Sequence, residues 1–293
     1  MQLKHIVGNT YYINYPSAVG VYIFDNNKCL LIDTGASSSF GKRTMKILDR
    51  RGIKVQGIIN THFHADHSGG NLITQQETGC SIYASLADKI IIENPLLSPF
   101  SVYSAYPLKP LQNKLIMGEA SKVTHTLTED LLVINNQEFR IHNLNGHTMG
   151  QIGIVTPDEV FFTGDAIISQ RNIEKFPFLY MADLTSYLET INKLKATNYP
   201  YVVVSHGGLL ENWQEALEAN KKLIEAIIEI ILAKLTVPQS RETIVQEVIN
   251  KLNLPINTSQ FFLVTATVSA YLSYLHSNRQ IKIIIEDQQV KFF

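Results

Sequence analysis

The stretch that decides the fold reads Thr61-His62-Phe63-His64-Ala65-Asp66-His67-Ser68-Gly69-Gly70-Asn71. It follows an apolar run, Val55 to Asn60, which the pattern predicts to be a short strand. Neutral imidazole nitrogens and carboxylate oxygens are the usual ligands of zinc and similar divalent ions, and they would lack partners in an apolar core. Residues two apart on extended backbone point the same way, so His62 and His64 can face one ion. The segment therefore predicts a metal-binding loop at a strand end.

The distribution of histidines along the rest of the chain supports this prediction. Five of the nine histidines fall in candidate ligand positions, each at a predicted strand end or beside a glycine. The other four, His5, His125, His142 and His276, occur alone. A lone histidine is more often a surface or satisfied core residue than a ligand, so these four are left out of the candidate site.

The run 61–71 resembles the His-x-His-x-Asp-His signature of the metallo-β-lactamase superfamily. Further ligands in that family come from a Gly-His-Thr, a Gly-Asp and a late Gly-His or Ser-His element. The matching segments here, in the same order, are Gly146-His147-Thr148, Gly164-Asp165 and Ser205-His206-Gly207. The resemblance covers roughly residues 8 to 212, and four elements in order are far more specific than any one of them.

The resemblance implies a fold, a cofactor and a reaction. The fold is an α/β (α+β) four-layer αββα sandwich, and the cofactor is a pair of divalent metal ions, with zinc expected and iron or manganese as alternatives. One ion would be held by His62, His64 and His147, the other by Asp66, His67 and His206, and Asp165 would bridge them. A hydroxide shared by the two ions would then attack the substrate, which makes the protein a metallo-hydrolase.

Two aspartates are assigned roles beside the metal. Asp66, besides being a ligand, is the candidate catalytic residue, which would orient the attacking water or help to protonate the leaving group. Asp33 ends an apolar strand in Leu31-Ile32-Asp33-Thr34-Gly35, which resembles the family's Asp-Thr-Gly element. It is expected to accept a ring N–H from a ligating histidine, and the alternative is an Asp that caps the next turn or helix.

The order of predicted elements divides the chain into a catalytic domain over 1–212 and a smaller, mainly helical domain over 213–293. In the first, strands and helices alternate; the predicted helices are 37–51, 86–93 and 184–197. Residues 94–110 contain four prolines and are expected to resist regular structure, either as a surface loop or as a lid. In the second, helices over 213–232, 241–252 and 259–275 precede a hairpin, a layout that suggests a winged-helix-like module. That module could be a dimerisation surface or a wall of the substrate pocket.

Composition narrows the setting of the protein. The net charge of −1 gives no general attraction to phosphate polymers. Two cysteines, Cys29 and Cys80, are too few for a disulfide framework and fit a reducing cytoplasm. Met1 to Thr10 lacks the apolar run of a secretory signal, and the apolar stretch Leu223 to Leu232 is too short to cross a bilayer. We therefore expect a cytoplasmic protein without a membrane partner.

Several superfamily members are disfavoured by the sequence. A di-iron flavoprotein normally has Glu at the position of His64, a β-CASP nuclease needs a large insertion, and a true β-lactamase would carry an export signal. The glyoxalase II-like and β-lactamase-like protein 2 groups remain, so we expect a small ester, thioester or lactone as substrate. The alternatives are a phosphodiesterase or ribonuclease, disfavoured because the basic residues after 213 form no stripe, and a non-enzymatic metal-binding regulatory protein.

Overall fold

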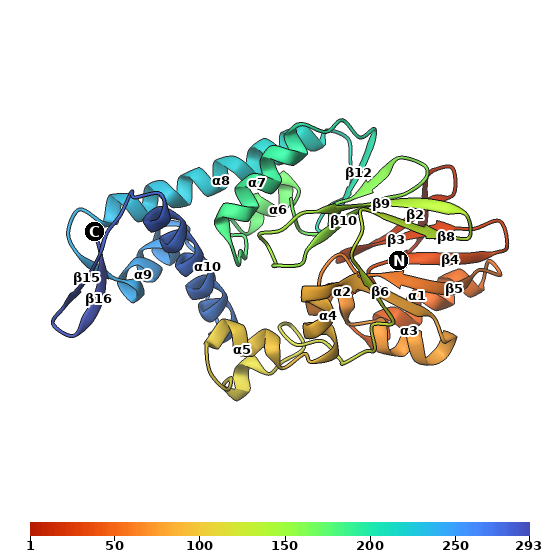
Figure 1. Cartoon of the computed structure of the whole chain (residues 1–293), viewed down its shortest axis with the longest axis horizontal. Helices are drawn as coiled ribbons and strands as arrows, with labels where there is room; N and C mark the ends of the chain where they lie inside the picture. The colour runs from red at the N-terminus through yellow and green to blue at the C-terminus, as the bar shows by residue number, and fades with distance from the viewer.

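Two β-sheets packed face to face form the larger part of the protein (Figure 1). The computed structural model describes residues 1–293 with the exception of the side chain of Tyr15. The first sheet contains, in spatial order, β1 (Leu3–Val7), β2 (Thr10–Tyr15), β3 (Ser17–Ile23), β4 (Lys28–Ile32), β5 (Lys54–Ile59), β6 (Ser81–Ser85) and β7 (His125–Leu127). The second contains β13 (Gly208–Leu210), β12 (Tyr201–Val204), β11 (Val160–Phe162), β10 (Ile152–Val155), β9 (Gln137–Asn143) and β8 (Leu131–Ile134).

Strand β4 shows why the first sheet lies in the interior. Its sequence is almost continuously apolar, as expected for a strand that is covered on both faces. Leu30 and Ile32 pack into the core between the two sheets, whereas Cys29 and Leu31 pack into the core on the opposite face. Because β4, β5 and β6 run parallel, their C-terminal ends meet at one edge of the sheet.

Helices cover the outer face of each sheet. Helices α1 (Ser38–Asp49) and α3 (Asn71–Thr78) pack together and against β5. Helix α7 (Leu184–Lys195) shares a core with β11 and β12 of the second sheet. A side chain caps the start of α7, where Asp183 accepts the backbone N–H of Thr185 at 2.9 Å. The arrangement is the αββα sandwich expected from the sequence.

The last third of the chain is mainly helical and extends away from the sandwich (Figure 1). It consists of α8 (Trp213–Lys234), α9 (Arg241–Lys251) and α10 (Thr258–Ser277) with a small sheet of order β14 (Gln239–Ser240), β16 (Gln289–Phe292) and β15 (Ile283–Glu286). Three helices with a terminal hairpin agree with the predicted layout. The winged-helix relationship and the boundary at residue 212 stay predictions. No helix of the described chain is both long enough and apolar enough to span a bilayer.

Helix α8 joins the two parts through one continuous core. Leu184 and Tyr187 of α7, Leu223 and Ile224 of α8, and Tyr271 of α10 belong to the same buried cluster. In the N-terminal half of α8, the buried side-chain amide of Asn220 donates to the backbone carbonyl of Ile168 at 2.7 Å. It also accepts the backbone N–H of Ile168 at 3.2 Å. A fully paired polar contact of this kind fixes the orientation of α8 on the sandwich.

The segment 94–110 is the clearest departure from the sequence-based prediction. It was expected to resist regular structure, but it forms α5 (Leu97–Tyr103), and a short 3-10 turn, η1 (Lys109–Leu111), follows. Pro99 is the third residue of α5, where the backbone N–H has no partner inside a helix, so its missing donor costs nothing. The remaining short helices are α2 (Ala65–Ser68), α4 (Leu86–Glu93) and α6 (Gln170–Lys175).

Candidate metal centre

The histidine-rich loop leaves the C-terminal end of β5 and is anchored there by Asp33, which follows the neighbouring strand β4. The Asp33 carboxylate accepts the backbone N–H of Thr61 at 2.8 Å and its hydroxyl at 2.7 Å. Asp33 itself has a positive φ of 63°, which turns the chain out of the sheet. The loop then closes into α2, so that His62, His64 and His67 all turn toward the same edge of the sheets.

Three imidazoles form the first group of candidate ligands. The Nδ1 atom of His64 lies 3.1 Å from Nε2 of His62 and 2.8 Å from Nε2 of His147. Burial and the neighbouring imidazole of His147 lower the pKa of His64 to about 3. Burial likewise lowers the pKa of His62 and of His147 below the ordinary value. All three rings are therefore neutral near pH 7, which is the form that binds a metal ion.

The second group combines two carboxylates and two imidazoles. Nε2 of His206 lies 3.3 Å from Oδ2 of Asp66 and 3.2 Å from Oδ2 of Asp165. Nε2 of His67 lies 3.4 Å from an oxygen of each aspartate. Burial alone would raise the pKa of both carboxyl groups, but the facing His67 and His206 hold each pKa well below its ordinary value. Both aspartates are therefore ionised.

Asp165 connects the two groups. Its Oδ2 atom, besides facing His206, lies 3.7 Å from Nε2 of His147 and 4.0 Å from Nε2 of His62. It reaches this position from the turn after β11, where Gly164 takes a positive φ of 58° and packs against Thr61. The residue predicted to bridge two ions is thus the one whose carboxylate faces both sets of ligand atoms.

Two buried atoms in this site test whether a metal ion fits it. Within the described part of the chain, Nε2 of His67 and Oδ1 of Asp165 have no hydrogen-bond partner. They face each other at 3.4 Å. Leaving a buried polar atom unpaired costs about 1–3 kcal/mol. A cation held between these atoms would satisfy both, so the donor set fits a divalent ion.

In two of the candidate ligand rings, the nitrogen that points away from the site is hydrogen-bonded to the protein. Nδ1 of His67 donates to Oδ2 of Asp33 at 2.8 Å, and Nδ1 of His147 donates to the carbonyl of Tyr180 at 2.9 Å. Each contact fixes the ring so that its Nε2 lone pair points into the site. Gly146, with a φ of 127°, makes room for this arrangement, because a Cβ atom there would overlap the backbone of Tyr187.

Two further residues of the site were missed by the sequence interpretation. Ser17 donates its hydroxyl to Oδ2 of Asp66 at 3.1 Å, and it comes from strand β3, remote in sequence from every motif. Asp88, on α4, is buried beside Thr148, whose hydroxyl faces its carboxyl oxygens at 3.4 Å. Burial raises the pKa of Asp88 to about 8. Neither residue has a sequence signature, because a single Ser or Asp in an ordinary element gives no signal.

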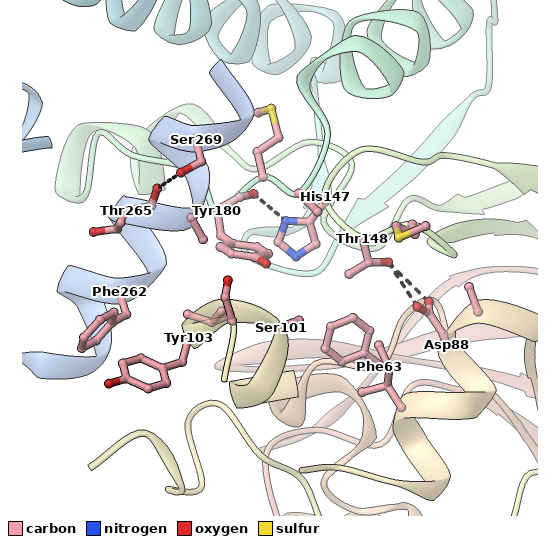
Figure 2. A pocket seen from close by; sticks show the side chains of 18 of the residues that line it. Phe63, Asp88, Ser101, Tyr103, His147, Thr148, Tyr180, Phe262, Thr265 and Ser269 are labelled. Atoms are coloured by element: carbon pink, nitrogen blue, oxygen red, sulfur yellow. Dashed lines mark hydrogen bonds between the residues drawn. The ribbon is translucent and has the colours of Figure 1, made fainter. Parts of the chain in front are cut away.

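A cavity of about 680 Å³ opens beside the first group of candidate ligands (Figure 2). His147 and Thr148 form part of its wall, together with Phe63 of the histidine-rich loop. The rest of the wall comes mainly from α4, from α5, from the segment at Tyr180 and from α10, with Arg241 of α9. The volume lies in the range of about 300 to 1,000 Å³ that is usual for small-molecule sites.

The comparison with known families agrees with this geometry. The family description "Metallo-beta-lactamase superfamily" matches residues 14–206, which include every candidate ligand. The chain belongs to this superfamily. This superfamily is one of metal-dependent hydrolases, and the two clusters of His and Asp side chains in this chain are compatible with metal binding.

Curated relatives match part of the chain at low sequence identity. A hydroxyacylglutathione hydrolase of Cereibacter sphaeroides is 29% identical over 126 residues, 43% of this chain and 39% of that protein. One of Pelagibacter ubique is 26% identical over 152 residues, 50% of this chain and 52% of that protein. The chain therefore spans about half or less of the length of these relatives.

Two solved structures match over almost the whole chain. A metallo-beta-lactamase family protein of Thermus thermophilus has a TM-score of 0.75 at 17% identity and covers 98% of this chain and 99% of its own. A beta-lactamase domain protein of Burkholderia ambifaria has a TM-score of 0.77 at 15% identity, with 99% and 92% covered. At these identities the likeness shows the fold, including an equivalent of the C-terminal helices.

Proposed function

We propose that this protein hydrolyses the thioester or ester bond of a small substrate, with two divalent metal ions as cofactors. The observation that carries the proposal is the convergence of seven His and Asp side chains, from four separate segments, beside a cavity of small-molecule size. His147 belongs to both the ligand set and the cavity wall. A substrate bound in the cavity would therefore lie next to the ions.

The chain offers a place for each ion. The ligands of one would be His62, His64 and His147; those of the other would be Asp66, His67 and His206, with Asp165 between them. Zinc is the expected metal, because nitrogen and oxygen ligands in this ratio suit it, and iron and manganese accept the same set. Such ions supply a water of lowered pKa and polarise the carbonyl oxygen of the substrate.

Asp66 is the proposed catalytic residue. Its side chain is 32% exposed, so one edge of the carboxylate remains open to solvent while Ser17 and His206 hold the other. Because the carboxyl group is ionised, it can accept a hydrogen bond and orient an attacking water, and it is unsuited to donate a proton. Ser17 keeps Oδ2 of Asp66 turned toward the ligand group.

The charge of the cavity favours a carbonyl substrate over a phosphodiester. Arg241 is the one Lys or Arg among the described residues of the cavity wall, and its guanidinium is paired with Glu242 at 3.1 Å. Nucleic acids require several cationic contacts to their phosphates. The names of the hydroxyacylglutathione hydrolases also support thioester chemistry.

A panel of substrates tests the proposal. The protein, purified and loaded with zinc, is assayed with a neutral thioester, a nitrophenyl ester and a bis-nitrophenyl phosphodiester. We expect thioester and ester turnover that is lost on chelation and falls at least a hundredfold in His64→Ala. His276→Ala, which removes an exposed histidine at the end of α10, is the matched control and should retain full activity. Turnover that is unchanged in His64→Ala, or that is confined to the phosphodiester, would contradict the proposal.

A further inference from the structure

The wall of the cavity opposite the metal ligands is formed by the C-terminal part of the chain. Phe262, Thr265, Ala266 and Ser269, one face of α10, line the same cavity as His147. Figure 2 shows His147 between this face and the pair Asp88 and Thr148. The cavity therefore extends from the ligand group toward α10.

Hydrogen bonds hold α10 against two other parts of the protein. The buried hydroxyl of Thr267 on α10 accepts the backbone N–H of Met181 at 3.1 Å. Near the start of the helix, Ser259 accepts the side-chain amide of Asn113 at 2.8 Å. Tyr103 of α5 also packs edge-on against Phe262, with ring centroids 5.2 Å apart. The position of α10 is thus set by the sandwich and by the segment 97–113.

The surface that α10 and α5 present to the cavity offers few hydrogen-bond donors to a ligand. Among the hydroxyl groups that line it, those of Ser101, Thr265 and Ser269 each donate to a backbone carbonyl of their own helix: Ser101 to Ser98 at 2.7 Å, Thr265 to Phe261 at 2.9 Å and Ser269 to Thr265 at 2.8 Å. Their donors are therefore not available to a ligand. The neighbouring side chains are aromatic or aliphatic.

We propose that the α10 wall is an acyl-binding site that selects thioesters or esters with an extended apolar acyl group. The acyl chain would lie against Tyr103, Phe262 and Ala266, with its carbonyl end toward His147. A charged, hydrogen-bonding group such as glutathione would find few partners there, because Arg241 is the single Lys or Arg of the described wall and the hydroxyl donors of Thr265 and Ser269 are engaged. This inference rests on the proposed function and adds the substrate class.

The first test varies the length of the acyl chain. Acetyl, hexanoyl and decanoyl thioesters of a neutral thiol, N-acetylcysteamine, are compared with the zinc-loaded protein. Burial of a methylene group is worth about 0.8 kcal/mol, or roughly fourfold in kcat/KM. We expect kcat/KM to rise by about two- to fourfold per added methylene until the cavity is filled. A hydroxyacylglutathione substrate should be poorer than the decanoyl thioester.

Variants of α10 locate the effect. Ala266→Leu places a larger side chain in the cavity and should lower kcat/KM at least tenfold for the decanoyl thioester, while the acetyl thioester changes less than twofold. Ser273→Leu makes a similar change at an exposed position of the same helix and should behave like the parent. Phe262→Ala enlarges the cavity and should shift the optimum to longer chains, which provides a second readout should Ala266→Leu fold poorly.

A binding measurement separates this inference from the proposed function. Titration of the protein with decanoic acid in a calorimeter should show saturable binding that weakens at least tenfold in Ala266→Leu and stays unchanged in Ser273→Leu. Binding without any hydrolysis would support the acyl site and overturn the proposed function. Hydrolysis with no dependence on chain length and no loss in Ala266→Leu would overturn the acyl site and leave the proposed function standing.

Discussion

Oδ2 of Asp33 lies 2.8 Å from Nδ1 of His67, and both side chains are almost fully buried. The carboxylate receives the N–H of the ring and leaves Nε2 directed at Asp66 and Asp165. The same carboxylate binds Thr61 at the start of the histidine-rich loop. One side chain therefore positions both the loop and one of the candidate ligands.

Replacement of Asp33 should weaken metal binding without removing a ligand. Loss of a partner that orients a ligating histidine typically costs about 10- to 100-fold in metal affinity. We expect Asp33→Ala to show a loss of this size in competition with a chelator, and Asp33→Asn, which keeps an acceptor oxygen, to lose less. Equal affinity in Asp33→Ala and the parent would show that Asp33 only stabilises the loop.

Removal of metal should lower the stability of the fold. An ion that binds the folded state alone, present at a hundred times its Kd, stabilises that state by about 2.7 kcal/mol. Thermal unfolding with and without a chelator should therefore give a Tm several degrees lower after chelation. In His62→Ala the difference should shrink, and in His276→Ala it should persist. An identical Tm in both conditions would count against a bound metal.

Gly146 should be the least replaceable glycine near the site. Gly146→Ala forces a Cβ into the backbone of Tyr187 and an L-residue into a φ of 127°, so we expect a loss of about 3 kcal/mol or more in unfolding free energy. Gly52→Ala is the matched control: its φ is also positive, at 72°, but the space around it is open, and it should cost about 1 kcal/mol. Urea unfolding measures both. Similar losses would mean that the contact with Tyr187 is unimportant.

Asp88 should make the stability depend on pH. Burial raises its pKa from 3.8 to about 8, so between these values the carboxyl is protonated in the folded state and ionised in the unfolded state. Stability from this group is complete below pH 3.8 and is lost as the pH rises, at about 1.4 kcal/mol per pH unit, until pH 8. Asp88→Asn removes the ionisation.

Urea unfolding at several pH values measures this effect. The stability of Asp88→Asn relative to the parent should increase steadily between pH 5 and pH 8, because only the parent loses unfolding free energy as this carboxyl group becomes ionised in the unfolded state. The difference between two variants cancels the titration of all other groups. A constant difference across this range would show that Asp88 is ionised in the folded protein.

The sequence predicted the structure best where the prediction depends on residues close together in the chain. The strand at β5 and the helix at α7 lie close to where the apolar patterns predicted them. The ligand loop was recognised because three imidazoles and a carboxylate crowd into positions 62–67. Patterns of this kind depend only on residues close together in the chain, so they can be recognised without knowledge of the fold.

The sequence was least informative where tertiary contacts decide the outcome. Four prolines made 94–110 look irregular, yet Pro99 falls in the first turn of α5, where it is tolerated. Asp88 and Ser17 join the site only because α4 and β3 begin beside it. The role of α10 was left open between a dimer surface and a pocket wall, and the cavity lining favours the wall.

The cavity is assembled from two regions that differ in what they contribute. The sandwich and its loops provide His147 and the other candidate ligands, whereas α10 provides much of the opposite surface. Exchanges at positions such as Ala266 or Phe262 touch none of the seven candidate ligands. Under the proposed function, substrate range can therefore diversify among descendants of this chain by repacking one helix, while the candidate metal site is inherited intact.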